Sequence, residues 1–345
     1  MTLQMQTVSR PSDFGQIDIN VAVTGDAEAP LIVCVHGWPE SWHSWNSQIE
    51  HFVALDYRVA AIDVRGYGES SRPDAIEAYR LVELCGDAAA VIEALSPDAP
   101  AIVFGHDWGS PIAYNTARLH PHLVQAVAGL SVPYIPATAG NPMDLWNLLY
   151  ADRFFYMKYF QEVGIAEAAF EADLPAALRK VYFGASGDAP SDLWFTDRPD
   201  GTALLDFLTD PDPAPAWMQS ERFAPVLKSN AGRSTHGWFN RYRAQHLDGA
   251  DIEGVGQPVI AQPACFIGGA KDIVRKFVDG VDLFEGAGAS LRDNRGVTII
   301  DDAGHWVHQE QPAATNQALE SFVVGLWHRS AHLRTRDHRD HRAPR

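Results

Sequence analysis

Asp107 is the residue whose surroundings point most directly to chemistry. It lies in the middle of the turn GHDWG at residues 105–109, between a short apolar run at 101–104 and a helical pattern at 111–118. The run is too short for a helix, so the pattern predicts strand, turn and helix in that order. In such an elbow the central side chain projects from the end of a sheet, and small neighbours let strand and helix pass closely. A carboxylate there is already a nucleophile at neutral pH, although the turn alone also fits an aspartate that only caps the helix.

Two further reactive residues follow predicted strands later in the chain. Asp272 comes just after one apolar run, and His305 comes just after another. The order nucleophile, acid, histidine is that of α/β-hydrolase enzymes. Asp301 and Asp302 also lie near His305 in the sequence, so the spacing alone leaves three candidates for the acid that orients the histidine.

Apolar runs bounded by turn residues alternate with helical patterns through most of the chain. Such alternation is typical of an α/β protein with a mostly parallel sheet. The expected strands are 17–23, 31–35, 58–62, 101–104, 126–130, 264–268 and 297–300, and the expected helices are 41–55, 81–95, 111–118 and 311–327. Ligands bind such sheets at the carboxyl ends of the strands, where this reading places Asp107.

Residues 135–246 interrupt the alternation. The segment lacks β-rich runs, follows a helical pattern and is rich in aromatic residues, with Pro and Gly clusters that mark loops. We interpret it as a helical cap inserted over the strand ends, so that residues 1–134 and 247–328 form the core domain. Residues 329–345 hold six Arg against two Asp. Their lack of apolar residues favours a disordered basic tail over a metal or polyanion site.

Composition limits the kinds of partner that the protein can have. The chain of 345 residues has a formal net charge of −17, and because its tail contributes +4, the remainder carries −21. This charge disfavours nucleic acid and anionic membranes. The absence of an apolar run of about 18 residues or a secretory signal pattern predicts a soluble, cytoplasmic protein. The three cysteines are widely spaced, and we expect them to be reduced and buried.

Six motifs connect these features to a known family. In chain order they are HGWPESW at 36–42, GYGESS at 66–71, GHDWG at 105–109, YMKYFQE at 156–162, NRYR at 240–243 and GHW at 304–306. Each is weak alone, but together and in this order they are specific. From about residue 30 to about residue 322 the chain resembles the soluble epoxide hydrolases of the α/β-hydrolase fold. The resemblance implies a mostly parallel, eight-stranded sheet with an inserted helical cap.

The resemblance also implies a two-step reaction. Asp107 attacks an epoxide carbon, and the phenols of Tyr156 and Tyr242 protonate the alkoxide that leaves. His305 then takes a proton from the water that hydrolyses the ester, while Asp272 orients the imidazole. Among the three candidate acids we prefer Asp272, because it follows its strand as the acid of this family does.

The rest of the site follows from the same resemblance. The backbone N–H groups of Trp38 and Trp108 are the expected oxyanion donors. Trp38, Trp108, Phe155 and Trp306 are expected to line an apolar pocket for a small hydrophobic epoxide. Water is the cosubstrate, no metal or organic cofactor is implied, and detoxification is the expected role. The oligomeric state is left open, with a homodimer as one option.

A haloalkane dehalogenase is the nearest alternative. It uses the same Asp and His chemistry but needs no acid, because a halide leaves unaided. Tyr156 and Tyr242 therefore favour the epoxide hydrolase, as does His106, where such dehalogenases usually have Gln. Fluoroacetate-type dehalogenases expect Arg where this chain has Trp108. A non-catalytic binding module on the same fold is disfavoured by the complete set of reactive residues, and an esterase would need Ser at the position of Asp107.

Overall fold

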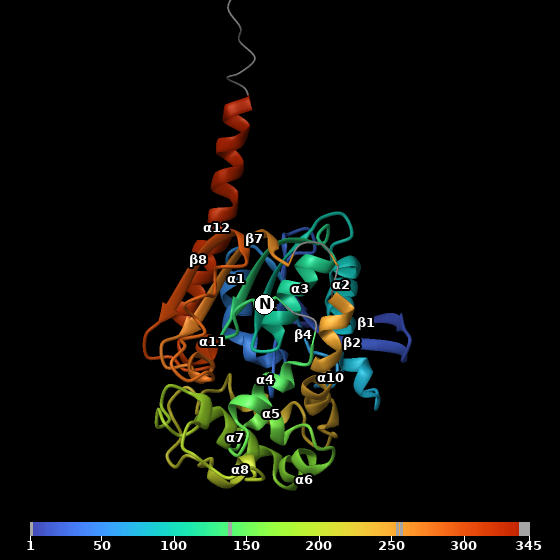
Figure 1. Cartoon of the computed structure of the whole chain (residues 1–345). Helices are drawn as coiled ribbons and strands as arrows, with labels where there is room; N and C mark the ends of the chain where they lie inside the picture. Colours follow the sequence, from blue (N-terminus) through green and yellow to red (C-terminus); the bar gives the residue numbers. More distant parts are fainter. Residues whose placement is uncertain (1–2, 137–139, 253–254, 256–257, 338–345) are drawn as a thin grey trace, which may run out of the picture.

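An eight-stranded sheet forms the centre of the molecule (Figure 1). The computed structural model describes residues 3–136, 140–252, 255 and 258–337. Within these residues the strands are β1 (Gln4–Ser12), β2 (Gly15–Thr24), β3 (Leu31–Val35), β4 (Arg58–Ile62), β5 (Ala101–His106), β6 (Val124–Leu130), β7 (Ile260–Gly269) and β8 (Leu291–Ile300). Their order is β1-β2-β4-β3-β5-β6-β7-β8, with antiparallel pairing from β1 to β4 and parallel pairing from β4 to β8. This topology confirms the predicted α/β-hydrolase fold.

The central strands form where the sequence has continuous apolar runs. Every residue of β3 and of β5 is buried. Helices cover both faces of a parallel sheet, so both sets of side chains along such a strand must be apolar. The two strands run side by side and in parallel, with Val35 opposite Gly105. The loops that leave them therefore meet at one edge of the sheet.

Strand β1 is absent from the sequence-based prediction. Most of its nine residues are exposed and only Val8 is buried, so the apolar pattern that marks a strand is weak. Its backbone pairs with β2 along the whole length, from Gln4 opposite Val23 to Ser12 opposite Gly15. The strand is thus specified by hydrogen bonding to a neighbour rather than by its own side chains.

Four helices cover the two faces of the sheet. Helices α2 (Leu81–Leu95) and α3 (Gly109–Leu119) pack on one face, and α1 (Asn46–Val53) and α12 (Pro312–Asp337) pack on the other. The helices predicted at 81–95 and 111–118 are confirmed. The one predicted at 41–55 consists of a short 3-10 turn followed by α1.

A second layer of helices lies over the carboxyl ends of the strands, in the lower part of Figure 1. In the described part of the chain between β6 and β7, its helices are α4 (Pro142–Leu149), α5 (Tyr156–Tyr159), α6 (Ile165–Ala172), α7 (Leu174–Ala185), α8 (Leu204–Phe207), α9 (Ala224–Lys228) and α10 (His236–Ile252). We refer to residues 142–252 as the cap. The predicted cap boundary at residue 246 falls inside α10, which packs along α2 as it returns to the sheet.

The structure differs from the prediction for residues 329–337, the first part of the expected disordered tail. They continue helix α12, which extends away from the rest of the molecule in Figure 1. A helix that is already formed propagates easily because each added residue gains a hydrogen bond, and Ala331 and Leu333 are good helix formers. The remainder of the predicted tail, 338–345, lies outside the described residues.

Composition predicts reduced, buried cysteines and no membrane-spanning helix. Cys34, Cys85 and Cys265 are buried and form no disulfide, in agreement with the prediction. Among the residues that the structure describes, no helix combines the length and the apolar character needed to span a membrane.

A buried cluster of charges ties the edge of the sheet to α2. Arg65, in the loop after β4, donates to both carboxylate oxygens of Asp87 at 2.9 and 2.6 Å, and Arg10 of β1 donates to the same carboxylate at 2.7 Å. The side chain of Asp87 is 3% exposed and that of Arg65 is fully buried. Charges this deep in a protein are tolerated only when they are paired.

Replacing Asp87 by Ala should lower the free energy of unfolding by about 3 kcal/mol, because two guanidinium groups would lose a buried carboxylate and keep only Glu83 as an acidic partner. Denaturant unfolding followed by far-UV circular dichroism measures the change. Asp98→Ala, at an exposed position, is the control and should change the free energy by less than about 0.5 kcal/mol. Equal effects of the two substitutions would contradict a structural role for the cluster.

Candidate active site

Asp107 follows β5 and adopts a backbone conformation that is uncommon for a residue with a side chain. Its φ of 49° lies in the left-handed region, which is costly outside glycine. A Cβ atom on Gly105 would lie 2.1 Å from the carbonyl oxygen of Gly109, and one on Gly109 would lie 2.0 Å from that of Val35. Only glycine fits these two positions, and the resulting tight turn lifts the side chain of Asp107 above the edge of the sheet.

The carboxylate of Asp107 is held from two sides. The backbone N–H of Trp38 donates to Oδ1 at 2.7 Å, and Nε2 of His305 lies 3.3 Å from Oδ2. Gly37 permits this approach, because a Cβ there would lie 2.3 Å from Oδ1. Of the two predicted oxyanion donors, the N–H of Trp38 therefore already contacts the carboxylate. The backbone N–H of Trp108, the other predicted donor, makes no hydrogen bond to the carboxylate of Asp107; both residues belong to the described part of the chain.

His305 lies between two carboxylates. Its Nδ1 is 3.0 Å from Oδ1 and 3.2 Å from Oδ2 of Asp272, whose side chain is fully buried. Asp301 and Asp302, the other two candidates, are exposed, and Asp302 pairs with Lys271 instead. The structure thus brings Asp272 to the histidine. Because a carboxylate accepts only, Nδ1 carries a proton toward Asp272 and Nε2 faces Asp107.

The charge state of His305 depends on both neighbouring carboxylates. Burial opposes protonation of the ring, but the carboxylates of Asp272 and Asp107 outweigh it and raise the pKa of His305 well above its ordinary value. The two carboxylates therefore favour the protonated form of the imidazole in the free site. Removing the charge of either carboxylate must lower the pKa of the histidine.

Two tyrosines from the cap face this group. Tyr156 begins α5 and Tyr242 lies in α10, and their ring centroids are 5.8 Å apart. Both rings pack against Trp38. Burial raises the pKa of each phenol well above its ordinary value, and the negative charge of Asp107 raises it further. Both phenols are therefore protonated and able to donate at neutral pH.

The reactive side chains line a cavity of about 20 Å³ between the sheet and the cap. That volume is sufficient for about one water molecule. Asp107, His305, Tyr156 and Tyr242 all contribute to its wall. The structure thus gathers a carboxylate, a histidine and two phenols around one small, mostly apolar space.

Two of the four predicted pocket residues contribute to this cavity. Trp38 and Trp306 line it. Phe155 and Trp108 instead pack against the two tyrosines, with ring centroids 5.0 and 5.3 Å apart. These two side chains support the cavity wall from behind.

Several apolar wall residues were not predicted from the sequence. They come from α7, from a cap loop and from the segment after β7, and they are Val181, Ala185, Trp194, Ile273, Val274 and Phe277. No local pattern marks them. Only the packing of the cap on the core decides which apolar residues of these segments face the cavity.

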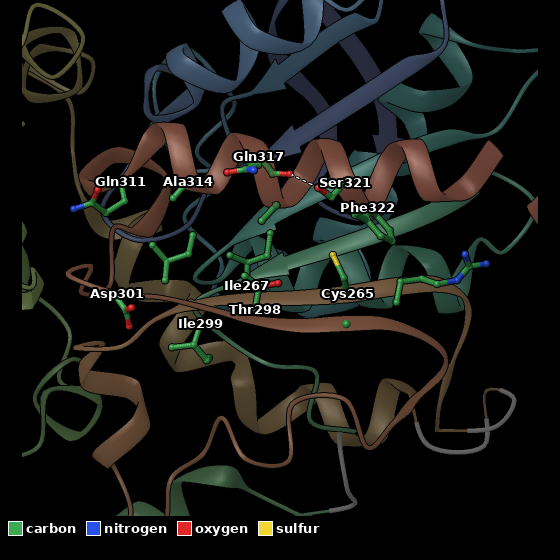
Figure 2. A pocket seen from close by; sticks show the side chains of 14 residues that line it. Cys265, Ile267, Thr298, Ile299, Asp301, Gln311, Ala314, Gln317, Ser321 and Phe322 are labelled. Carbon is green, nitrogen blue, oxygen red and sulfur yellow. Dashed lines mark hydrogen bonds between the residues drawn. The ribbon is translucent and has the colours of Figure 1, made fainter. Parts of the chain in front are cut away.

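A larger groove elsewhere on the molecule contains none of the reactive residues. It has a volume of about 630 Å³ and lies between α12 and strands β7 and β8, with Cys265, Asp301 and Ser321 among its lining (Figure 2). A choice of site by cavity volume alone would therefore favour this groove over the cavity beside Asp107.

Glu40, His106 and His308 form a buried cluster whose nitrogen and oxygen atoms lie within 4.8 Å of one another. Both ring nitrogens of His106 are already engaged, Nδ1 with Oε2 of Glu40 and Nε2 with the carbonyl oxygen of His305, each at 2.7 Å. Oε2 of Glu40 also accepts from the N–H of Gly37 at 2.8 Å. Both nitrogens of His106 therefore already face oxygen atoms, and the pair of Glu40 and His106 supports the site from behind. Neither ring nitrogen of His308 makes a hydrogen bond to the described residues.

Comparison with known proteins identifies relatives over almost the whole chain. A family model described as the alpha/beta hydrolase fold matches residues 30–312. Epoxide hydrolase A of Mycobacterium tuberculosis is 33% identical over 317 residues, which cover 91% of this chain and 96% of the relative. Epoxide hydrolase B of the same species is 34% identical over 338 residues, covering 87% of this chain and 93% of the relative.

Solved structures give the same result. An epoxide hydrolase from an endophytic Streptomyces superposes with a TM-score of 0.82 at 36% identity and covers 93% of this chain and 96% of its own. Epoxide hydrolase A from Mycobacterium thermoresistibile superposes with a TM-score of 0.84 at 34% identity, covering 94% of this chain and 99% of its own.

Replacing Asp107 by Asn should lower the pKa of His305, because one of the two carboxylates that raise it becomes neutral. A titration of the imidazole signals by NMR measures the shift. Asp302→Asn serves as the control, since this carboxylate is exposed and pairs with Lys271, and it should leave the titration of His305 unchanged. An unchanged pKa in Asp107→Asn would contradict the electrostatic coupling.

Proposed function

The chain belongs to the epoxide hydrolases of the α/β-hydrolase family, and on that premise we propose that it converts a small hydrophobic epoxide and water to a vicinal diol through an ester on Asp107. The observation that carries the proposal is the meeting of the Asp107 carboxylate and the two phenols, Tyr156 and Tyr242, at one cavity. A nucleophile and an acid for the leaving oxygen are what opening of an epoxide requires.

In the first step a carboxylate oxygen of Asp107 forms a bond to one epoxide carbon. The bond from that carbon to the ring oxygen breaks, and the oxygen takes a proton from Tyr156 or Tyr242. Because burial keeps both phenols protonated, either can donate at neutral pH. The product is an ester whose alkyl part carries a hydroxyl group.

In the second step water attacks the carbonyl carbon of the Asp107 ester. Ester formation has by then removed the charge of Asp107, so the pKa of His305 falls. Its Nε2 proton passes to the phenolate left by the first step, which restores the phenol and leaves a neutral ring that can act as a base. His305 takes the proton from water, and Asp272 stabilises the imidazolium that results. The bond from the carbonyl carbon to the alkyl oxygen then breaks, the imidazolium protonates that oxygen so that the diol leaves, and the proton left on the carboxyl group of Asp107 returns to His305. The N–H of Trp38, 2.7 Å from Oδ1 in the free site, donates to the oxyanion. Such a donor contributes about 3 kcal/mol.

The cavity also limits how substrate can bind. A volume of about 20 Å³ is far smaller than an epoxide that carries an alkyl or aryl group. Binding must therefore move side chains of the wall, or the cap as a whole, away from Asp107. The apolar residues that line the wall favour a hydrophobic substituent on the epoxide.

The variant His305→Gln should retain the ester, because the base for its hydrolysis is gone. After exposure to an aryl epoxide, its intact mass should increase by the mass of the whole epoxide. The gain should disappear when Asp107→Asn is added. Exposure to a bromoalkane is the matched control and should add nothing. A gain equal to the alkyl group, from the bromoalkane alone, would sink the proposal in favour of a dehalogenase.

Replacing either active-site tyrosine by Phe should slow ester formation roughly 10- to 100-fold, and replacing both should slow it roughly 10²- to 10⁴-fold, because the leaving oxygen loses its proton donors. Rapid-quench measurement of the ester in a single turnover gives the rate. Tyr159→Phe is a control in the same helix, since the Tyr159 hydroxyl is buried without a partner, and it should not change the rate. A double variant as fast as the original enzyme would show that another group is the acid.

A further inference from the structure

The carboxylate of Glu310 accepts hydrogen bonds from three backbone N–H groups, and the two-step reaction described above gives it no role. Glu310 ends the short helix α11 (Val307–Glu310), which begins two residues after His305. Its Oε2 accepts from Gly187 at 2.8 Å and from Gly304 at 2.9 Å, and its Oε1 accepts from Trp306 at 2.9 Å. Two of the three amides flank His305, and the third belongs to the cap.

This carboxylate occupies a position where charge is costly. Burial raises the pKa of Glu310 to about 7, even though all three hydrogen bonds act to lower it. A buried carboxylate that lacked these partners would be strongly destabilising. The three N–H groups therefore define the place of the side chain, and the side chain in turn fixes the three backbone segments relative to one another.

The cap meets the loop of His305 at the same point. The N–H of His305 donates to the carbonyl oxygen of Ala185 at 2.9 Å, and the indole N–H of Trp306 donates to that of Tyr182 at 2.7 Å. The two backbones touch, since a Cβ on Gly304 would lie 2.3 Å from the nitrogen of Gly187. Glu310 thus completes a junction between the end of α7 and the loop of the histidine.

The nucleophile is positioned by other parts of the chain. Asp107 is fixed by the turn between β5 and α3 and by the N–H of Trp38. Neither Trp38 nor the turn donates a hydrogen bond to Glu310. When a change at Glu310 displaces the imidazole of His305, Asp107 therefore loses the contact at Oδ2 but keeps its turn and the N–H of Trp38 at Oδ1.

We propose that Glu310 is a positioning residue that fixes the loop of His305 against the cap, and that it thereby supports hydrolysis of the ester but not its formation. The assignment rests on the proposed two-step reaction. Ester formation needs the carboxylate of Asp107 and the phenols of the cap, whereas hydrolysis needs Nε2 of His305 at the attacking water. A displacement of a reacting group by about 1 Å can cost roughly 100-fold in rate.

The test separates the two steps in a single turnover with an aryl epoxide, by rapid quench and mass measurement of the ester. In Glu310→Gln the amide oxygen can replace only one of the two carboxylate oxygens, so the NH₂ group meets at least one N–H donor and the junction is weakened. We expect the rate of ester formation to stay within about twofold and that of hydrolysis to fall roughly 10- to 100-fold, so that the ester accumulates. Asp302→Asn neutralises an exposed carboxylate of the same loop and should change neither rate.

A second variant guards against a folding defect. Glu310→Asp keeps the charge but is too short to reach all three amides, and it should give the same separation of rates, with thermal unfolding recorded for each variant. An equal loss in both steps, or unchanged hydrolysis in a folded variant, would overturn the role of Glu310. If His305→Gln forms no ester from the epoxide, the two-step reaction itself fails and the assignment fails with it. If His305→Gln does form the ester, but the Glu310 variants slow both steps equally or neither, only the role assigned to Glu310 is overturned.

Discussion

The site depends on one imidazole that is shared by two buried carboxylates. His305 faces Asp272 through Nδ1 and Asp107 through Nε2, and together these anions raise its pKa against the effect of burial. In the proposed reaction Asp107 becomes a neutral ester and Asp272 does not, so the two carboxylates have different fates. On that proposal, ester formation removes one of the two charges that favour the protonated imidazole and thereby favours the neutral ring that can activate water. One structural arrangement serves both steps, and no second conformation of the core is needed.

That arrangement requires several elements to end at the same edge of the sheet. Parallel strands with β3 beside β5 bring the loop of Trp38 against the turn of Asp107, and the close contact is possible only because Gly37 has no side chain. Asp272 follows β7 and His305 follows β8 in the same way. The two phenols come from α5 and α10 of the cap. The proposed acid and the proposed nucleophile therefore lie in different layers of the molecule.

The sequence predicts what local patterns encode. Continuous apolar runs and the turn around Asp107 predicted the central strands, a mostly parallel sheet and the position of Asp107 at the end of its strand, since each depends on neighbours in the chain. The choice among Asp272, Asp301 and Asp302 depends on which side chain is buried beside His305, and spacing cannot show that. Strand β1, in which only Val8 is buried, is specified by its pairing with β2. Cavity residues such as Phe277 are specified by the packing of the cap on the core. Such long-range contacts leave no periodic pattern in the sequence.

The loop of His305 is held on two sides by different layers of the molecule. The backbone carbonyl oxygen of His305 accepts from His106 and from Ser131, both at 2.7 Å, and these donors belong to the core. Its N–H donates to Ala185 at the end of a cap helix. If the substrate is admitted by movement of the cap rather than of wall side chains, the bond from His305 to Ala185 is the one that this movement strains, because the bonds to His106 and Ser131 stay within the core. In the proposed reaction, closure of the cap over the ester would then also restore the support of the group that hydrolyses it.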